Sequence, residues 1–175
     1  MSMLLDLSRF RGGVERIERQ DDPSAFDLTD DEFRLIGPVS FVAEVQKDAR
    51  KVRLVGRTVA TLELKCGRCL EPFQVPVDSA FDLLFLPATE AVGGADEEID
   101  AADVGVSFYQ DDVIDLADVI REQLYLALPM KPLCRQDCLG LCPVCGQNRN
   151  TTPCTCKTEW VDPRMDALRK LKKDS

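Results

Sequence analysis

Histidine is absent from this chain of 175 residues. Its absence excludes a Ser-His-Asp or Cys-His nucleophile, a histidine base and a mixed His/Cys metal site, because each of these needs an imidazole. A metal ion in this protein must therefore be held mainly by thiolates, and the sequence contains eight cysteines.

Long hydrophobic runs are also missing. No apolar stretch approaches the roughly 20 residues that a membrane-spanning helix needs, and residues 1–10 lack the basic region and apolar stretch of a secretory leader. We therefore expect a cytoplasmic protein without a membrane partner. In a reducing compartment, paired cysteines indicate metal ligands or redox groups more often than structural disulfides.

Basic side chains are scarce in the first 130 residues. Residues 1–130 hold 13 basic and 26 acidic side chains, a formal charge of -13, whereas residues 131–175 hold 9 basic and 5 acidic side chains, a charge of +4. Together with the chain length, this contrast predicts a main domain over residues 1–130 and a cysteine-rich unit over residues 131–175. We expect the two parts to face different partners.

Alternating hydrophobic residues predict an antiparallel sheet in the main domain. In the strongest pattern, from Val52 to Leu64, every second residue lies on one side of a period-two repeat. Residues 39–47 and 73–86 continue the alternation on either side, which indicates a β-meander with turns near residues 47–50 and 66–72. Short further strands are expected at 3–7, 14–17 and 104–108. The acidic segments 20–32 and 88–103 indicate loops.

One amphipathic helix is predicted after the sheet. Asp115 is suited to cap its N-terminus, and apolar residues then recur at spacings of three and four until Pro129. These residues are Leu116, Val119, Ile120, Leu124, Ala127 and Leu128. A second helix is expected to begin at Asp162 and Pro163 and to end in basic residues. The predicted fold class is therefore α+β: an antiparallel β-meander covered by one amphipathic helix, with a C-terminal cysteine-rich zinc segment and a terminal helix.

The cysteines after residue 140 have the spacing of a zinc knuckle. Cys142 and Cys145 are separated by two residues and followed by Gly146. A tight turn of this kind directs both sulfurs at one ion, and the glycine permits the backbone to bend sharply. Cys154 and Cys156 supply a second pair close by, so these four cysteines form the first predicted site.

A second four-thiolate site is predicted from the remaining cysteines. Cys66 and Cys69 form another CxxC pair, and Cys134 and Cys138 could complete the set, which would join the sheet to the cysteine-rich segment. The spacing leaves an alternative open, in which Cys134 or Cys138 replaces one sulfur of the later CxC pair. Four protein thiolates would close the coordination shell and make the metal structural.

Other chemistry fits these cysteines less well. An iron-sulfur cluster also takes four thiolates, but the CPxCG knuckle and the absence of a ferredoxin-like cysteine run favour zinc. A redox-active CxxC is typical of a βαβ unit, whereas Cys66 and Cys69 are predicted to lie in a turn between two strands.

Four segments, in order, resemble the YceD family of large ribosomal RNA subunit accumulation proteins. They are CGRCL at 66–70, the helix at 115–129 that ends in LALP, LGLCPVCG at 139–146 with Asn148 and Asn150, and DPR at 162–164. The resemblance covers most of the chain from about Val39. It implies a role in the synthesis or processing of large-subunit ribosomal RNA and supplies no catalytic residue.

Two functions follow as hypotheses. The leading one is a non-enzymatic ribosome-biogenesis factor that binds a ribosomal RNA precursor, a ribosomal protein or an rRNA-processing enzyme and uses no small-molecule substrate. The alternative is a thiol-disulfide oxidoreductase that uses Cys66 and Cys69.

Two basic regions are candidates for contact with RNA or another partner. The first contains Lys131, Arg135, Arg149, Lys157, Arg164, Arg169, Lys170, Lys172 and Lys173. The second contains Lys47, Arg50, Lys51, Arg53, Arg57, Lys65 and Arg68. A metal site shared by both parts of the chain would bring the regions to one face, and Arg68, Arg149 and Lys170 are the residues predicted to bind. Charges that merely solvate a strand edge and cap a helix are the open alternative.

Overall fold

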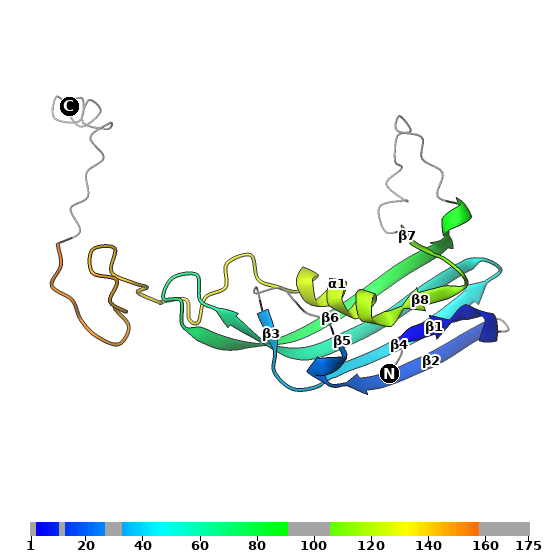
Figure 1. Cartoon of the computed structure of the whole chain (residues 1–175), viewed down its shortest axis with the longest axis horizontal. Helices are drawn as coiled ribbons and strands as arrows, with labels where there is room; N and C mark the ends of the chain where they lie inside the picture. Colours follow the sequence, from blue (N-terminus) through cyan, green and yellow to red (C-terminus); the bar gives the residue numbers. More distant parts are fainter. Residues whose placement is uncertain (1–2, 11–12, 27–32, 91–105, 158–175) are drawn as a thin grey trace, which may run out of the picture.

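A curved sheet forms the body of the protein (Figure 1). The structure is a computed structural model that describes residues 3–10, 13–26, 33–90 and 106–157. Within these ranges the sheet has six strands, in the order β2-β4-β5-β6-β7, with β3 beside β5. The strands are β2 (Gly13–Asp21), β3 (Phe33–Leu35), β4 (Val39–Asp48), β5 (Lys51–Lys65), β6 (Pro72–Pro87) and β7 (Val106–Tyr109).

The hairpin of β5 and β6 is the longest feature of the sheet. The two strands are paired antiparallel from Val52 opposite Phe85 to Lys65 opposite Pro72. The buried residues of β5 alternate without a break from Val52 to Leu64, apart from Gly56, as the sequence pattern predicts. This single side of the strand faces the core, and the hairpin carries the residues that follow Lys65 to the far end of the sheet.

β6 confirms the strand pattern predicted over residues 73–86, whereas β7 differs from the predicted antiparallel arrangement. β6 is one strand of 16 residues that runs through Pro76. Proline has no backbone N–H to donate. It is tolerated at Pro76 because β7 pairs only with Leu84–Pro87 of β6, so in the described chain no strand other than β5 lies beside Pro76 to require that hydrogen bond. β7 lies parallel to β6, whereas the meander was predicted to be antiparallel.

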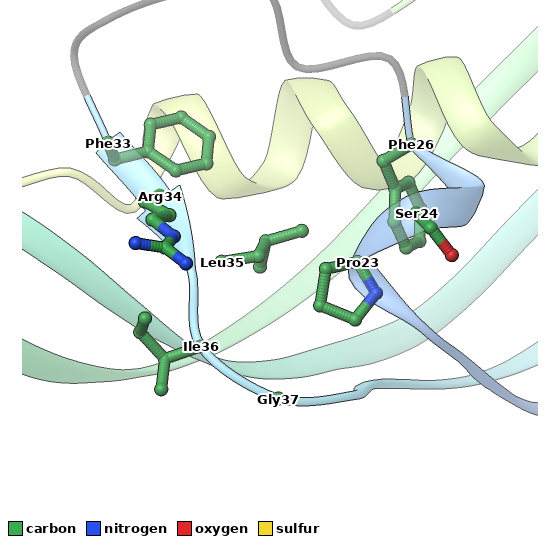
Figure 2. Close-up of a pocket in the computed structure, with 8 residues that line it drawn as sticks. All are labelled: Pro23, Ser24, Phe26, Phe33, Arg34, Leu35, Ile36 and Gly37. Atoms are coloured by element: carbon green, nitrogen blue, oxygen red, sulfur yellow. The ribbon is translucent and has the colours of Figure 1, made fainter.

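A pocket of about 580 Å³ lies beside β3. Figure 2 shows its lining residues coming from β3 on one side and from η2 (Pro23–Ala25), a 3-10 turn, on the other. Phe26, Phe33 and Leu35 are buried in its walls, and Arg34 supplies the charge of the lining. These three buried residues of the walls therefore belong to the hydrophobic core.

One helix and a two-stranded ribbon cover the concave face of the sheet (Figure 1). The ribbon pairs β1 (Leu4–Asp6) with β8 (Val113–Asp115), and the helix α1 (Leu116–Leu126) follows directly. The carboxylate of Asp115 accepts a hydrogen bond from the Ala117 N–H at 2.8 Å, so it caps α1 as predicted.

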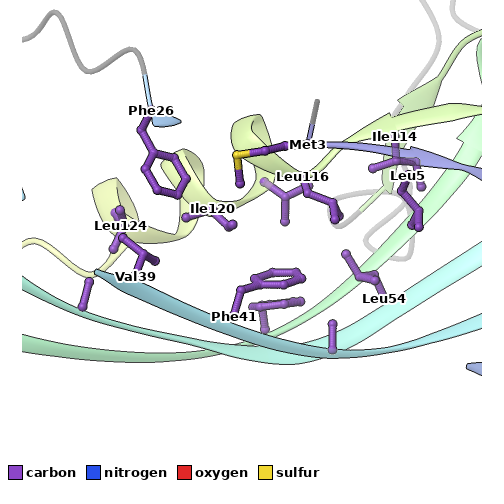
Figure 3. Packing of buried hydrophobic residues seen from close by; sticks show 14 of the residues in the cluster. Met3, Leu5, Phe26, Val39, Phe41, Leu54, Ile114, Leu116, Ile120 and Leu124 are labelled. Carbon is purple, nitrogen blue, oxygen red and sulfur yellow. The ribbon is translucent and has the colours of Figure 1, made fainter. Parts of the chain in front are cut away.

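The core lies between α1 and the sheet (Figure 3). The buried residues of α1 are Leu116, Val119, Ile120, Gln123 and Leu124. Four of these are on the predicted apolar face. Below them, the ring of Phe41 stacks on that of Phe81, with centroids 5.5 Å apart. Burying these side chains stabilises the fold through the hydrophobic effect, at about 25 cal/mol per Å² of apolar surface.

Gly56 allows the sheet to pack closely at its centre. A Cβ atom at this position would overlap the carbonyl oxygen of Val42, and it would lie 2.7 Å from the Phe81 ring and 2.8 Å from the Cα of Ala43. The space of a side chain is thus occupied by the neighbouring strand and by the stacked aromatic pair. This explains why the period-two pattern of β5 contains a glycine.

Several predicted features fall outside the described residues. The terminal helix from Asp162 does so, as do 27–32 of the first predicted loop and 91–103 of the second. A short 3-10 turn precedes each of these two gaps: η2 before 27–32, and η3 (Ala88–Glu90) before 91–103. Another such turn, η1 (Leu7–Arg9), follows β1. In the described ranges no helix is long and apolar enough to cross a membrane.

The close packing at Gly56 can be tested by substitution. Gly56→Ala should lower the free energy of unfolding by about 2 kcal/mol, because the added methyl group overpacks the sheet. Gly67→Ala is the matched control, since a Cβ there would meet only the Pro132 carbonyl oxygen at an ordinary 3.5 Å. Urea unfolding measures both variants, and equal midpoints would contradict the packing argument.

Candidate metal centre

The tip of the β5–β6 hairpin is a tight turn that carries two cysteines. Cys66 continues the buried face of β5 and is fully buried, and Cys69 is 4% exposed. The Leu70 N–H donates to the Cys66 carbonyl at 2.9 Å, and the Cys66 N–H donates to the Glu71 carbonyl at 3.0 Å. Leu70 closes the turn with a positive φ of 62°.

The segment around Cys142 repeats this turn. The Gly146 N–H donates to the Cys142 carbonyl at 2.8 Å, and the Cys142 N–H donates to the Gln147 carbonyl at 2.8 Å. Gly146 has a φ of 73° and occupies the position that Leu70 takes in the first turn. A leucine in this left-handed region costs about 1 kcal/mol more than a glycine, so the hydrogen bonds of the first turn must hold it there.

The structure gathers four thiols at the hairpin tip. Their sulfurs, from Cys66, Cys69, Cys134 and Cys138, all lie within 4.8 Å of one another. The Cys66 and Cys138 sulfurs are 3.9 Å apart, and the Cys69 and Cys134 sulfurs are 3.7 Å apart. This first tetrad takes two sulfurs from each side of residue 130, the predicted domain boundary.

The remaining four thiols form a second tetrad. The sulfurs of Cys142, Cys145, Cys154 and Cys156 also lie within 4.8 Å of one another. Cys142 is the one buried member of this tetrad, whereas three members of the first tetrad are buried, so the second tetrad lies nearer the surface. The structure therefore groups the eight cysteines in the two sets that the spacing favoured.

The sulfur separations fit a tetrahedral metal ion. Four thiolates at about 2.3 Å from an ion would be about 3.8 Å from one another, which matches the 3.7 Å and 3.9 Å pairs of the first tetrad. A disulfide would need an S–S distance of about 2.05 Å. Both tetrads could thus hold one metal ion each, with no coordination position left for water.

Backbone amides favour the thiolate form of the first cysteine in each turn. Burial raises the pKa of the Cys66 thiol, but N–H groups of Cys134, Cys69 and Arg68 outweigh burial and lower this pKa to about 6. N–H groups of Cys145 and Val144 lower the pKa of Cys142 to about 6. Preformed N–H donors of this kind stabilise the negative sulfur that a metal ion requires.

Two further thiols, Cys134 and Cys156, are harder to ionise when no cation is bound. Burial raises the pKa of Cys134 to about 12, with contributions from the neighbouring sulfurs. The sulfur of Cys145 raises the pKa of Cys156 to about 12. Several thiolates cannot share so small a space without a cation, so each tetrad as a whole is suited to a positive ion.

Arg68 fastens the hairpin tip to the segment that follows α1. Its guanidinium donates to the carbonyls of Gln136 at 3.2 Å and Cys138 at 2.9 Å. The backbone adds two bonds, from Gly67 N–H to the Pro132 carbonyl at 2.7 Å and from Leu141 N–H to the Arg68 carbonyl at 3.0 Å. Arg68, predicted to bind a partner, thus has a structural role as well.

Asn148 and Asn150 support the first tetrad from the segment that follows Cys145. The Asn150 amide donates to the Cys138 sulfur at 3.3 Å, and its oxygen accepts from the Leu139 N–H at 2.8 Å. Asn148 accepts from both the backbone and the side chain of Asn150, at 3.0 Å and 2.8 Å. The sequence indicated these asparagines only through the family resemblance, because their role depends on a contact with a distant cysteine.

The two predicted basic regions meet only in part. Arg53 and Arg57 form ion pairs with Asp82 and Asp78 across the outer face of the hairpin. Lys47, Arg50 and Lys51 lie at the opposite end of β5 from its tip, about 45 Å away for a strand of this length. Of the hairpin cations, Lys65 and Arg68 are therefore the ones beside the tetrads.

The other predicted contact residues are only partly described. Arg149 is exposed and its N–H donates to the Gly140 carbonyl at 2.9 Å, which fixes the backbone at this position. Lys170 lies outside the described residues. Binding by Arg68, Arg149 and Lys170 stays a prediction.

Comparison with known proteins identifies relatives of this chain. A protein-family model described as "Large ribosomal RNA subunit accumulation protein YceD" matches residues 54–172, a stretch that contains all eight cysteines. An uncharacterized protein of Mycobacterium tuberculosis is 34% identical over 124 residues, which cover 71% of this chain and 57% of that protein. No solved structure matches the chain.

Two further relatives come from other groups of organisms. A protein of Zea mays named as a chloroplastic homolog of the large ribosomal RNA subunit accumulation protein is 32% identical over 147 residues, covering 71% of this chain and 50% of that protein. An uncharacterized protein of Bacillus subtilis is 26% identical over 144 residues, covering 81% of this chain and 78% of its own length. The chain spans about half the length of the first relatives that it matches.

The grouping of the cysteines predicts the metal content. Protein purified under reducing conditions should hold two metal ions per chain, and Cys66→Ser and Cys142→Ser should each hold one. The double variant should hold none, because each substitution opens a different closed shell. Elemental analysis of all four proteins gives the result. A Cys66→Ser variant that keeps both ions would show that the sulfurs are grouped differently in solution.

Proposed function

The chain belongs to the YceD family, and from this membership we propose that it is a non-enzymatic factor in the synthesis, processing or accumulation of large-subunit ribosomal RNA. The match across residues 54–172 is the observation that supports this proposal. It includes the hairpin tip and both tetrads, so the family resemblance extends over the candidate metal centre. The names of the plant relatives point to the same process.

Structural zinc is proposed for both tetrads. Four thiolates and a tetrahedral arrangement suit zinc, and a closed shell leaves no site for a catalytic water. Bound zinc would cross-link the hairpin to the segment after α1, and the residues that would hold it are the eight cysteines. The thiolate chemistry also fits a reducing compartment, which supports action in the cytoplasm.

The proposed partners are a ribosomal RNA precursor, a ribosomal protein or an rRNA-processing enzyme. The charge of -13 over residues 1–130 makes the body of the sheet a poor platform for RNA, since phosphate binding depends on lysine and arginine. The cysteine-rich segment carries the net positive charge. We therefore assign partner binding to this segment and to the hairpin tip.

The alternative function, a thiol-disulfide oxidoreductase, is disfavoured by the position of its two cysteines. Cys66 is fully buried and Cys69 is 4% exposed, so a disulfide substrate has little access to either sulfur. Both sulfurs also contact a second pair of cysteines. A lowered pKa at Cys66 is expected for a metal ligand as well as for a redox thiol.

Metal removal tests the proposed division at residue 130. Metal binding can supply about 10 kcal/mol to local folding. A chelator should therefore speed hydrogen exchange in residues 131–157 and at the hairpin tip, while β4, which has a strand on each side, stays protected. Mass spectrometry of the exchanged protein resolves these segments. Uniform loss of protection would contradict a separate metal-stabilised unit.

The RNA hypothesis is tested by separating charge from structure. Arg149→Glu combined with Lys170→Glu should reduce co-sedimentation with large-subunit precursors, and added salt should have the same effect. Lys51→Glu, at the other end of β5, is the control for charge. Arg68→Glu should also lower metal content, because Arg68 holds the Cys138 loop. Co-sedimentation that neither the double variant nor salt changes would exclude an electrostatic RNA contact.

A further inference from the structure

The strand β2 forms one edge of the sheet (Figure 1). All nine of its residues pair with β4, from Gly13 opposite Lys47 to Asp21 opposite Val39. No strand of the described chain pairs with its other side. Half of the backbone N–H and C=O groups of β2 therefore point away from the sheet and can pair with another strand.

The charges of β2 are symmetric about its central residue. Glu15, Ile17 and Arg19 share the side of the strand that faces the core of the sheet, opposite the buried residues of β4. Arg16 and Glu18 share the other side. The sequence Glu15-Arg16-Ile17-Glu18-Arg19 has opposite charges at equal distances from Ile17.

This symmetry makes the strand complementary to itself. In an antiparallel pair of two β2 strands centred on Ile17, Glu15 lies opposite the second copy's Arg19, and Arg16 lies opposite the second copy's Glu18. Ile17 lies opposite itself. All four charged residues then face an opposite charge on the same side of the sheet, and such cross-strand pairs are favourable.

Neighbouring registers lose this match. A centre at Arg16 or Glu18 places like charges directly opposite each other, and a slip by one residue places Glu15 opposite Glu18 or Arg16 opposite Arg19. Like charges in these positions are destabilising, and a one-residue slip also exchanges the two sides of the strand. The charge pattern thus selects one register.

Pairs within the strand do not prevent this association. Arg16 and Glu18 are 3.6 Å apart and their side chains are 66% and 70% exposed, so their ion pair is weak and can exchange partners. Arg19 binds Asp21 through Nε and Nη2, at 3.0 Å and 2.8 Å. That pair does not use Nη1 of Arg19, which can donate to a second carboxylate.

We propose that two copies of this chain associate through β2, antiparallel about a twofold axis at Ile17. The sheets of the two copies then become one continuous sheet. β5 runs in the same direction as β2, because both pair antiparallel with β4. The two hairpin tips therefore lie at opposite ends of the joined sheet, and each keeps its cysteine tetrads away from the interface.

Charge exchange tests the proposal. Sedimentation velocity over a concentration series should show a dimer of the full chain. Arg16→Glu should weaken dimerisation about tenfold, because it replaces two attractive pairs by two repulsive ones, and Glu18→Arg should do the same. The double variant Arg16→Glu/Glu18→Arg should restore the dimer, since every charge again faces its opposite. Lys51→Glu, with the same change in net charge as Arg16→Glu, should leave the dimer unchanged.

Three results would overturn the proposal. One is a monomer at every concentration, and another is a dimer that the single variants leave intact, which would place the contact elsewhere. The third is a double variant that stays as weak as the single ones although its circular dichroism matches that of the wild type. If β2 binds a different protein and not a second copy, the purified chain would likewise be a monomer at every concentration.

Discussion

The gathering of four sulfurs at the hairpin tip is the constraint on which the arrangement of this protein depends. Cys66 and Cys138 are 72 residues apart, and Cys69 and Cys134 are 65 apart, yet each pair lies within 4 Å. Closing so long a loop costs entropy, and a bound metal would offset that cost. The position of the described residues after α1, up to residue 157, relative to the sheet follows from this closure.

The packing of the sheet fixes part of this tetrad. The period-two pattern of β5 that buries Leu62 and Leu64 also buries Cys66, so core packing fixes the direction of the first sulfur. Gly67 and Arg68 then donate hydrogen bonds to backbone carbonyls of the segment that follows α1. Core, turn and tetrad thus share one strand, and a change in the register of β5 would move all three together.

Much of this structure could be predicted from residue patterns with a short range. The alternation in β5, the cap at Asp115 and the spacing of each cysteine pair depend on neighbours within a few residues. The parallel pairing of β7 depends on which strand edge of the sheet is unoccupied, and the sequence does not specify this locally. The role of Asn150 could not be predicted from its neighbours in the sequence either, because its side chain donates to a sulfur 12 residues away across a turn.

Electrostatic contacts distinguish the arginines that are bound by other residues of the chain from those considered for the proposed partner contact. Arg53 and Arg57 face aspartates across the hairpin, and Arg68 faces two carbonyl oxygens. A count of basic residues along the chain therefore overstates the positive surface of β5. Arg149 differs, because its backbone is fixed beside Gly140 while the residue stays exposed. A side chain with an ordered backbone loses less entropy on binding, so charge near the tetrads is better placed for recognition than charge along the strands.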